Sequence, residues 1–428
     1  MNVSSQKWTN DSVKAIIVGS FATLFEWYDY ALYGYFAPVI ARQFFPSEDS
    51  YLSLLMTFAA FATGFIVRPL GAVFFGYLGD RLGRKYALSL SVILMAVPTA
   101  IIGVLPTYSD IGALAPILLI LIRVTQGLAV GGNYGGAFVF VIEHAPDNKK
   151  CLAGSCLMVG TIGGILVGSA MAALLSWVMD PESLADWGWR IPFVLGLLAT
   201  LAGLYMRKKV PETPEFEAQK NLTDLAKIPA GDVFKYHKKR LVTAVMSILP
   251  DVIGIYVMFF FMTTYLTEMV GWEMNTALTV NTINLCLMVA IIPFFGWLSD
   301  IVRPIRVMRW VAISFIITAI PCFILLSEYQ GVLAVLAQTV FAISIGAYYG
   351  SMPAAIVSFF PTELRYSASA LSFNISAAIF GGSTPWVCTW LIRSTDIIIS
   401  PAFYLVLTGL VTSVALMRMA KCETQQSI

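Results

Sequence analysis

Twelve long apolar stretches constrain the fold of this 428-residue chain more than any other feature of its sequence. A helix needs about 20 consecutive, mostly apolar residues to cross the hydrocarbon core of a bilayer. The stretches that meet this requirement are residues 14–40, 51–79, 86–106, 111–141, 152–179, 189–206, 241–270, 276–299, 305–326, 332–360, 367–392 and 397–419. Strands of an outer-membrane barrel are shorter and alternate in polarity, so we predict membrane-spanning helices.

The composition excludes the main soluble classes. Hydrophobic residues make up 58% of the chain and charged residues 12%, whereas soluble domains average about 45–50% and about 25%. The net charge of +2 is too balanced for a nucleic-acid-binding protein. With two histidines and no CxxC pair, we expect neither a metal site nor a cofactor. The polar N-terminus lacks a signal-peptide pattern, so we expect the first stretch to be retained as a span.

One long polar connection divides the twelve stretches into six and six. Residues 207–240 hold nine Lys or Arg residues and separate an expected N-terminal bundle, residues 1–206, from a C-terminal bundle, residues 241–428. With the N-terminus in the cytoplasm, 22 of the 27 Lys and Arg residues fall on the cytoplasmic side and three on the other. This asymmetry predicts a multi-pass protein of a bacterial-type inner membrane with both termini in the cytoplasm.

A short motif recurs in the two halves. Residues 75–80 read FGYLGD and residues 295–300 read FGWLSD, and a basic stretch follows each motif. Such matching features suggest two pseudo-repeats that an axis along the membrane normal relates. We predict that charged residues at these cytoplasmic helix ends form bridges in one conformation and break them in another. These gating residues are Asp80, Arg84, Glu143 and Asp300.

Acidic residues occur inside the first apolar stretch, where a buried charge is costly and therefore a functional candidate. Glu26 and Asp29 lie three residues apart on one helical face, and Tyr30 and Tyr33 flank that face. We predict that the two acids carry protons or contact substrate and that the tyrosines contact substrate. The alternative is that a neighbouring arginine neutralises these acids in a purely structural pair.

A second polar group lies in stretch 111–141. The spacing of Arg123, Gln126 and Asn133 places them on one side of a helix, which predicts a face toward a cavity rather than toward lipid. Because arginine stays charged at any useful pH, Arg123 is expected to bind a substrate carboxylate or to hold an acid ionised until substrate competes. A fixed ion pair remains the alternative.

The second half offers fewer candidates. Asp251 is its one acid deep inside a span, and we predict a secondary role in proton coupling. Arg68, in the first half, fits a structural role as well as a substrate role. Further polar residues could line the cavity or form interhelical hydrogen bonds. These substrate-contact candidates are Asn281, Asn284, Tyr348, Tyr349 and Asn374.

Seven motifs spread over most of the chain resemble those of the major facilitator superfamily. They are GDRLGRK at 79–85, RVTQG at 123–127, EWYDYALYG at 26–34, RPLG at 68–71, WGWRIPF at 187–193, FPTELRY at 360–366 and FGGSTP at 380–385. Together they resemble the metabolite:proton symporter family, whose members carry proline/betaine, α-ketoglutarate, citrate or shikimate. The resemblance implies an all-α fold of two six-helix bundles, alternating access, and proton-coupled uptake of a small carboxylate-bearing or zwitterionic metabolite. We expect a monomer whose partners are this metabolite, protons and the lipid bilayer.

One departure from the family pattern keeps an alternative open. Family members commonly read GGEYG in the fourth helix, whereas residues 131–135 read GGNYG, with Asn133 in place of the acid. The second hypothesis is therefore an uncoupled uniporter or exchanger. A drug-efflux antiporter is less favoured, because stretch 152–179 lacks the proline of that group's Gly-Pro motif. A membrane receptor would need a signalling domain for which the 34-residue linker and the short termini leave no room.

Overall fold

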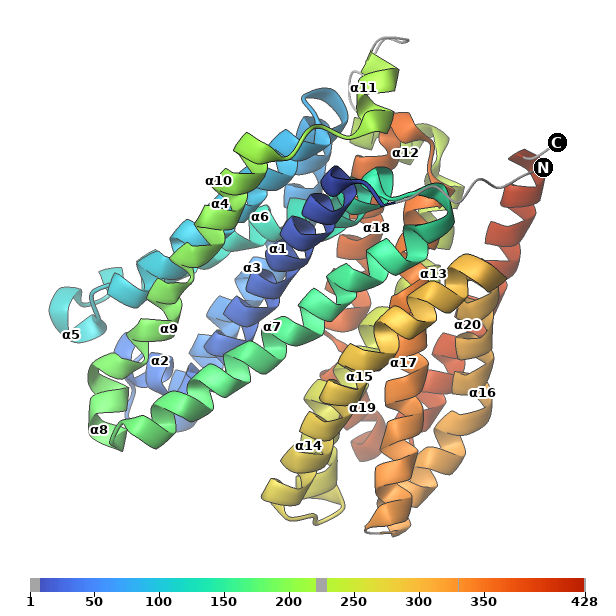
Figure 1. Cartoon of the computed structure of the whole chain (residues 1–428). Coiled ribbons are helices and arrows are strands. Elements are labelled where there is room, and N and C mark those ends of the chain that lie inside the picture. Colours follow the sequence, from blue (N-terminus) through green and yellow to red (C-terminus); the bar gives the residue numbers. More distant parts are fainter. Residues whose placement is uncertain (1–7, 221–228, 330, 427–428) are drawn as a thin grey trace.

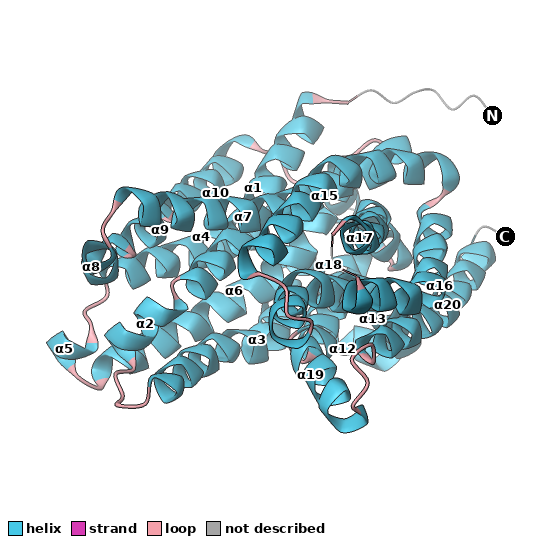
Figure 2. Cartoon of the chain, turned by 90° about the horizontal axis from the view of Figure 1, so that it is seen from below, coloured by secondary structure: helices cyan, strands magenta, loops and turns pink. Residues whose placement is uncertain are grey.

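The computed structural model describes residues 8–220, 229–329 and 331–426, and within these ranges all regular structure is helical (Figures 1 and 2). The helices before the linker are α1 (Asn10–Tyr35), α2 (Ala37–Phe44), α3 (Ser50–Arg81), α4 (Arg84–Val104), α5 (Tyr108–Ile111), α6 (Leu114–His144), η1 (Asp147–Lys149), α7 (Lys150–Val178), α8 (Pro181–Ser183), η2 (Leu184–Gly188), α9 (Arg190–Leu195) and α10 (Leu197–Lys209). We call these the N-terminal bundle.

The linker contributes two short helices, α11 (Pro214–Lys220) and α12 (Pro229–Tyr236). The helices after it, which we call the C-terminal bundle, are α13 (Lys238–Ile255), η3 (Tyr256–Phe261), α14 (Met262–Thr264), η4 (Tyr265–Met269), α15 (Met274–Val302), α16 (Pro304–Glu328), α17 (Val332–Phe359), η5 (Thr362–Leu364), α18 (Arg365–Ser376), η6 (Ala377–Gly381), α19 (Thr384–Thr395) and α20 (Pro401–Gln426). Each bundle packs mainly within itself, as α1 does with α7 and α16 with α20.

Ten helical segments in the described part of the chain are long and apolar enough to cross a membrane. The two predicted spans outside this set are 14–40 and 189–206. The first corresponds to α1, which carries Glu26 and Asp29, followed by α2. The second is divided at Gly196 into α9 and the 13-residue α10. These two segments run beside the other helices in Figure 1. Together with the ten they correspond to the twelve predicted stretches.

The two bundles meet more closely at one end of the molecule than at the other. Figure 1 shows α11, α12, the start of α1 and the end of α20 toward its top, where the bundles converge, whereas α8, α14 and α19 lie toward the opposite end. We call these the linker end and the distal end. Contacts between the bundles join α3 to α18 and α7 to α15. Seen from the distal end in Figure 2, α8, α9 and α10 lie on one side and α16 and α20 on the other.

The outer surfaces of both bundles are apolar. Ile66, Leu70 and Ile317 are 75%, 66% and 65% exposed, and Trp177 and Trp386 are also exposed. A soluble monomer rarely exposes apolar patches on this scale, because water does not solvate them favourably. These surfaces therefore fit a protein that lipid surrounds.

Glycine faces let α3 and α6 approach closely. A Cβ atom at Gly131 of α6 would overlap the backbone carbonyl oxygen of Arg68 in α3, and Gly127 meets the backbone of Gly64 in the same way. Small residues at such positions allow two helix backbones to come together in a membrane. This contact fixes the position of Arg68 relative to α6.

We expect Gly131→Ala to lower the apparent melting temperature, because its methyl group pushes α3 away from α6. Overpacking of this kind typically costs about 1–3 kcal/mol. Gly382→Ala is the matched control, since its Cβ would have no atom within 4 Å and its φ is −63°. Thermal unfolding of the two purified variants checks this prediction. Equal melting temperatures would contradict the close packing inferred here.

Candidate functional site

A polar pocket of about 30 Å³ lies between the two bundles. Helices α1, α3 and α6 face it from one side, and α13, α17 and α18 face it from the other. Its lining residues are Glu26, Trp27, Arg68, Tyr134, Asp251, Val252, Ile255, Tyr256, Tyr349, Phe373, Asn374 and Ala377. We call it the inner pocket. It collects one arginine and two acids in an otherwise apolar and aromatic environment.

The N-terminal bundle holds Glu26 and Arg68 in defined positions. The Glu26 carboxylate accepts a hydrogen bond of 2.8 Å from the Asn133 side-chain amide. The guanidinium of Arg68 lies 4.0 Å from the centre of the Phe65 ring and 4.9 Å from that of Tyr30. Cation–π contacts of this kind orient an arginine without neutralising its charge. Arg68 therefore reaches the pocket as a cation.

The C-terminal bundle contributes Asp251 and Asn374. Asp251 is 3% exposed and lies on α13, directly after Pro250. The Asn374 amide donates hydrogen bonds to the carbonyl oxygens of Gly131 (2.8 Å) and Ala370 (2.7 Å), so it crosses from α18 to α6. This bond ties the two bundles together beside the pocket.

A larger chamber of about 390 Å³ adjoins the inner pocket. Trp27 and Tyr256 line both spaces, so these two rings stand between them. The wall of the chamber is largely aromatic and includes Tyr30, Phe61, Phe65 and Asn281. A volume of this size suits a small metabolite, and the aromatic wall suits its apolar or cationic parts.

A second polar network lies within the N-terminal bundle and contains Asp29. Its carboxylate pairs with Arg123 at 2.7 Å and accepts hydrogen bonds from Thr99 (2.9 Å) and Gln126 (3.1 Å). The Arg123 guanidinium also lies 3.9 Å from the centre of the Tyr33 ring. Both charged side chains are only 1–2% exposed as residues. Asp29 and Arg123 thus form a buried ion pair, and neither lines the inner pocket or the chamber.

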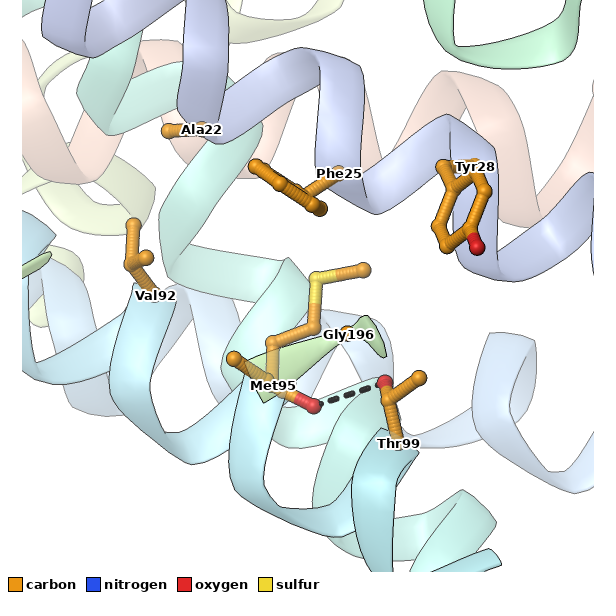
Figure 3. A pocket seen from close by; sticks show the side chains of 8 residues that line it. Ala22, Phe25, Tyr28, Val92, Met95, Thr99 and Gly196 are labelled. Atoms are coloured by element: carbon orange, nitrogen blue, oxygen red, sulfur yellow. Dashed lines mark hydrogen bonds between the residues drawn. The ribbon is translucent and has the colours of Figure 1, made fainter. Parts of the chain in front are cut away.

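A small cavity beside this network is not a substrate site. Figure 3 shows it between Ala22, Phe25, Val92 and Met95, with the Thr99 hydroxyl bonded to a backbone carbonyl at its edge. Its volume is about 10 Å³, which is about the space that one water molecule occupies. Its apolar wall offers few partners for a polar metabolite.

Two aspartates join the bundles at the linker end in equivalent ways. Asp80 of α3 accepts hydrogen bonds from the backbone N–H groups of Tyr366 (3.2 Å) and Ser367 (2.9 Å) at the start of α18. Asp300 of α15 accepts them from Cys151 (2.8 Å) and Leu152 (2.9 Å) at the start of α7. The first N–H groups of a helix lack intrahelical partners and carry partial positive charge, so a carboxylate there is stabilising. The two copies of the repeated motif thus close the linker end.

Further charges surround Asp80 and extend the closed linker end into the linker. Arg84 pairs with Asp80 at 2.8 Å and lies 3.6 Å from Glu143, and it donates to the carbonyl oxygen of Thr362. Arg365 pairs with Glu143 at 3.1 Å and also with Glu215 of α11. The bundles and the linker therefore share one network of charges in this conformation.

Glu212 connects the linker to the start of α4. Its carboxylate accepts hydrogen bonds from the backbone N–H groups of Lys85 and Thr213. Burial raises the pKa of Glu212, and these N–H donors oppose the shift because they stabilise the charged form. The linker is thus docked on the N-terminal bundle at this point.

The structure places the predicted site residues in several groups. Glu26, Asp251, Tyr349 and Asn374 line the inner pocket, and Tyr30 and Asn281 line the chamber. The remaining candidates do not line either space. They are Asp29, Tyr33, Arg123, Gln126, Asn133, Asn284 and Tyr348.

Two of these remaining candidates make contacts inside the C-terminal bundle. The Asn284 side chain accepts a hydrogen bond from Thr339 and donates one to a backbone carbonyl. The Tyr348 hydroxyl donates to the carbonyl oxygen of Ser247. Their proposed contact with substrate stays a prediction.

Several residues at the site were not singled out from the sequence. Tyr134, Tyr256 and Phe373 line the inner pocket, but an aromatic residue in a membrane span carries no signal that separates a pocket wall from ordinary packing. The sequence indicated Arg365 and Glu215 only weakly. Glu215 is an acid in a basic linker, and Arg365 follows the Pro-Thr-Glu motif. Neither signal indicated that the two would pair.

Comparisons with known proteins agree with this geometry. The model of the family described as "Sugar (and other) transporter" matches residues 15–228. A putative proline/betaine transporter of Staphylococcus aureus (strain COL) is 35% identical over 399 residues, which cover 92% of this chain and 84% of the relative. The proline/betaine transporter of Salmonella typhimurium (strain LT2) is 33% identical, with 94% of this chain and 83% of the relative covered.

Solved structures show the same fold at low sequence identity. A double tryptophan mutant of XylE matches with a TM-score of 0.78 at 16% identity, covering 97% of this chain and 96% of the other. FucP, described as a major facilitator superfamily transporter in the outward conformation, matches with a TM-score of 0.69 at 16% identity, with 96% and 99% covered. The relatives are named transporters and not enzymes. The chain is therefore a multi-pass membrane transporter that belongs to the sugar (and other) transporter family of the major facilitator superfamily.

Proposed function

We propose that this transporter takes up a small carboxylate-bearing or zwitterionic metabolite together with protons. The observation that carries the proposal is the inner pocket, where Glu26, Arg68 and Asp251 meet between the two bundles. Charges at such a position are costly unless a function retains them. The names of the relatives, proline/betaine transporters, support a zwitterionic amino acid or betaine as the first choice of substrate.

The contacts at the two ends of the molecule support alternating access as the proposed mechanism. In the present conformation Asp80 and Asp300 join the bundles at the linker end, while the chamber adjoins the inner pocket on its other side. Rocking of one bundle against the other about a fixed site would open the linker end and close the distal end. We assign the linker end to the cytoplasm of an inner-membrane protein, because most Lys and Arg residues fall on that side.

Proton coupling has two candidate centres. The first is the Asp29–Arg123 pair, which a proton on Asp29 would weaken by removing one of its two charges. The second is the pair of acids at the inner pocket, Glu26 and Asp251. Both lie within the membrane interior, where a proton and a substrate can compete for the same countercharge.

We expect a pH gradient, acid outside, to drive accumulation of proline or glycine betaine in proteoliposomes. A gradient of one pH unit stores about 1.4 kcal/mol per proton, which concentrates substrate about tenfold when one proton accompanies each molecule. Uptake of labelled substrate with and without a protonophore measures this effect. Accumulation that ignores both the gradient and the protonophore would contradict proton coupling.

One observation favours an uncoupled uniporter or exchanger as the second candidate. Asn133 donates a hydrogen bond to Glu26 at 2.8 Å, and an amide cannot carry a proton in place of a second acid. Such a protein would exchange labelled for unlabelled substrate without responding to pH gradients. The same liposome experiment therefore separates the two functions.

A further inference from the structure

The two buried arginines of the N-terminal bundle, Arg68 and Arg123, differ in their ion-pair partners. Asp29 and Arg123 neutralise each other in the N-terminal bundle. Arg68, by contrast, takes part in no ion pair within 4.0 Å among the described residues. Its side chain is buried, with the residue 6% exposed, and its Nε atom has no hydrogen-bond partner in the described part of the chain. The Nε–H group of Arg68 is therefore available as a donor to a partner that is not part of the protein.

The C-terminal bundle contributes an acid to the same pocket. Asp251 of α13 shares the inner pocket with Arg68 of α3, and it forms no ion pair within 4.0 Å among the described residues. Glu26 differs from it, because Glu26 accepts a hydrogen bond from Asn133 and lies in the same bundle as Arg68, with which it interacts electrostatically. The inner pocket thus holds one arginine and one acid of the N-terminal bundle, and a second acid, Asp251, faces them from the C-terminal bundle.

We infer that a zwitterionic substrate binds with its carboxylate on Arg68 and its cationic nitrogen at Asp251, so that one molecule bridges the two bundles. This assignment rests on the proposed function and adds which residue takes which end of the substrate. Arg68, and not Arg123, is then the carboxylate-binding residue, since Asp29 already occupies Arg123. Arginine suits this role because its planar fork matches a carboxylate.

Aromatic rings favour a substituted ammonium group at the Asp251 end. Tyr134, Tyr256 and Phe373 line the inner pocket with Asp251, and the Tyr134 and Phe373 rings meet edge to face at 5.2 Å. Ring faces attract quaternary and secondary ammonium groups, which have few or no N–H donors to satisfy. A betaine or an imino acid therefore fits this end of the pocket better than a bare cation that needs several hydrogen bonds.

The pocket must widen to hold such a molecule. Its volume of about 30 Å³ holds about two water molecules, so Trp27 and Tyr256, which separate it from the chamber, have to move apart. Tyr256 begins η3 and Ala377 begins η6, and both segments are π-helical interruptions beside the pocket. Interruptions of this kind are frequent at functional sites and give a helix a place to bend.

Three ligands of similar shape test the assignment. Glycine betaine carries both charges, tert-butylacetate replaces its nitrogen by carbon and keeps only the carboxylate, and choline keeps only the cation. An anionic ligand supplies no positive charge to Asp251, and a cationic ligand supplies no negative charge to Arg68. A buried charge without a partner is costly. We expect the purified wild-type protein to bind glycine betaine at least tenfold more tightly than either of the other two, by calorimetric titration.

Two substitutions should change these preferences in opposite directions. Arg68→Gln is expected to weaken the binding of glycine betaine at least tenfold and to strengthen the binding of choline. The preference for glycine betaine over choline therefore falls. Asp251→Asn is expected to weaken the binding of glycine betaine by a similar factor and to strengthen the binding of tert-butylacetate. The controls Arg393→Gln and Asp396→Asn change exposed residues at the distal end of α19 and should keep the wild-type order.

The outcomes distinguish a failure of the proposed substrate class from a failure of the assignment of Arg68 and Asp251 to the two ends of the substrate. A wild-type protein that binds neither glycine betaine nor proline would overturn the proposed substrate class. A wild-type protein that binds them, with both variants keeping the wild-type order of the three ligands, would overturn only the assignment of the two ends. Arg68→Met, which removes the charge without adding a buried polar group, replaces Arg68→Gln should that variant fail to fold.

Discussion

Arg123→Ala is expected to abolish substrate uptake, to below about 1% of the wild-type rate. The substitution removes the partner of Asp29, whose carboxylate is 2.7 Å from the guanidinium and almost fully buried. Breaking a buried pair from one side costs about 3–5 kcal/mol, because the remaining charge is uncompensated. The variant would thus lose the Asp29–Arg123 contact on which the proposed coupling rests.

Uptake of labelled proline or glycine betaine into proteoliposomes measures this effect, with thermal unfolding as the control for folding. The double variant Asp29→Asn with Arg123→Gln neutralises both partners and should regain much of the stability. We expect it to exchange substrate without accumulating it against a gradient. Near-normal uptake by Arg123→Ala would contradict the role given to this pair.

Removing Asp80 and Asp300 together is expected to open the linker end. Each carboxylate accepts two backbone N–H bonds from a helix of the opposite bundle, at distances of 2.8–3.2 Å. Hydrogen bonds to a charged group contribute about 1.5–3 kcal/mol each, so losing even one per aspartate shifts the equilibrium by more than tenfold. We expect Asp80→Ala with Asp300→Ala to populate the conformation that is open at the linker end.

A native cysteine reports this opening. Cys151 is 4% exposed at the start of α7, and its backbone N–H donates to Asp300. In a chain that keeps only this cysteine, we expect the double variant to react with N-ethylmaleimide at least tenfold faster than the parent. Asp396→Asn, which changes an exposed acid far from the linker end, should react at the parent rate. An unchanged rate in the double variant would show that the aspartates do not hold this end closed.

The sequence allows most of the fold to be predicted because the bilayer imposes strict lengths. Ten of the twelve apolar stretches meet the criterion for a span, and the two that do not have physical reasons. Glu26 and Asp29 lie within α1, and the stretch that holds α9 and α10 is broken at Gly196. The repeat around Asp80 and Asp300 also predicted a shared gating role; the two aspartates make equivalent contacts in the structure, and their role in gating stays a prediction.

The sequence did not predict that the two acids of α1, Glu26 and Asp29, have different partners. Residues three apart on a helix differ by about 60° in direction, which is enough to send two side chains to different neighbours. Glu26 reaches Asn133, whereas Asp29 reaches Arg123, because α6 runs opposite to α1 and presents its polar residues in reverse order. The sequence shows that both acids are candidates. Only the packing of α1 against α6 shows that they belong to separate networks.

The role of Arg68 could not be decided from the sequence either. The sequence left a structural role and a substrate role equally open. The structure places this arginine against Tyr30 and Phe65, with no acid within ion-pairing distance among the described residues, and at the interface pocket that also holds Asp251. Which charges face each other across two bundles depends on their relative placement, and a single sequence does not encode that placement in any local pattern.

Alternating access about the inner pocket is the central claim, and distances across both ends of the molecule test it most directly. Spin labels at Glu182 and Glu273 would span the distal end, and labels at Asn148 and Arg306 would span the linker end, because all four side chains are exposed. Pulsed electron paramagnetic resonance measures both distances. We expect glycine betaine, and likewise a change of pH, to shorten the distance across the distal end and to lengthen the distance across the linker end. Two distances that stay fixed, or that change in the same direction, would contradict the account.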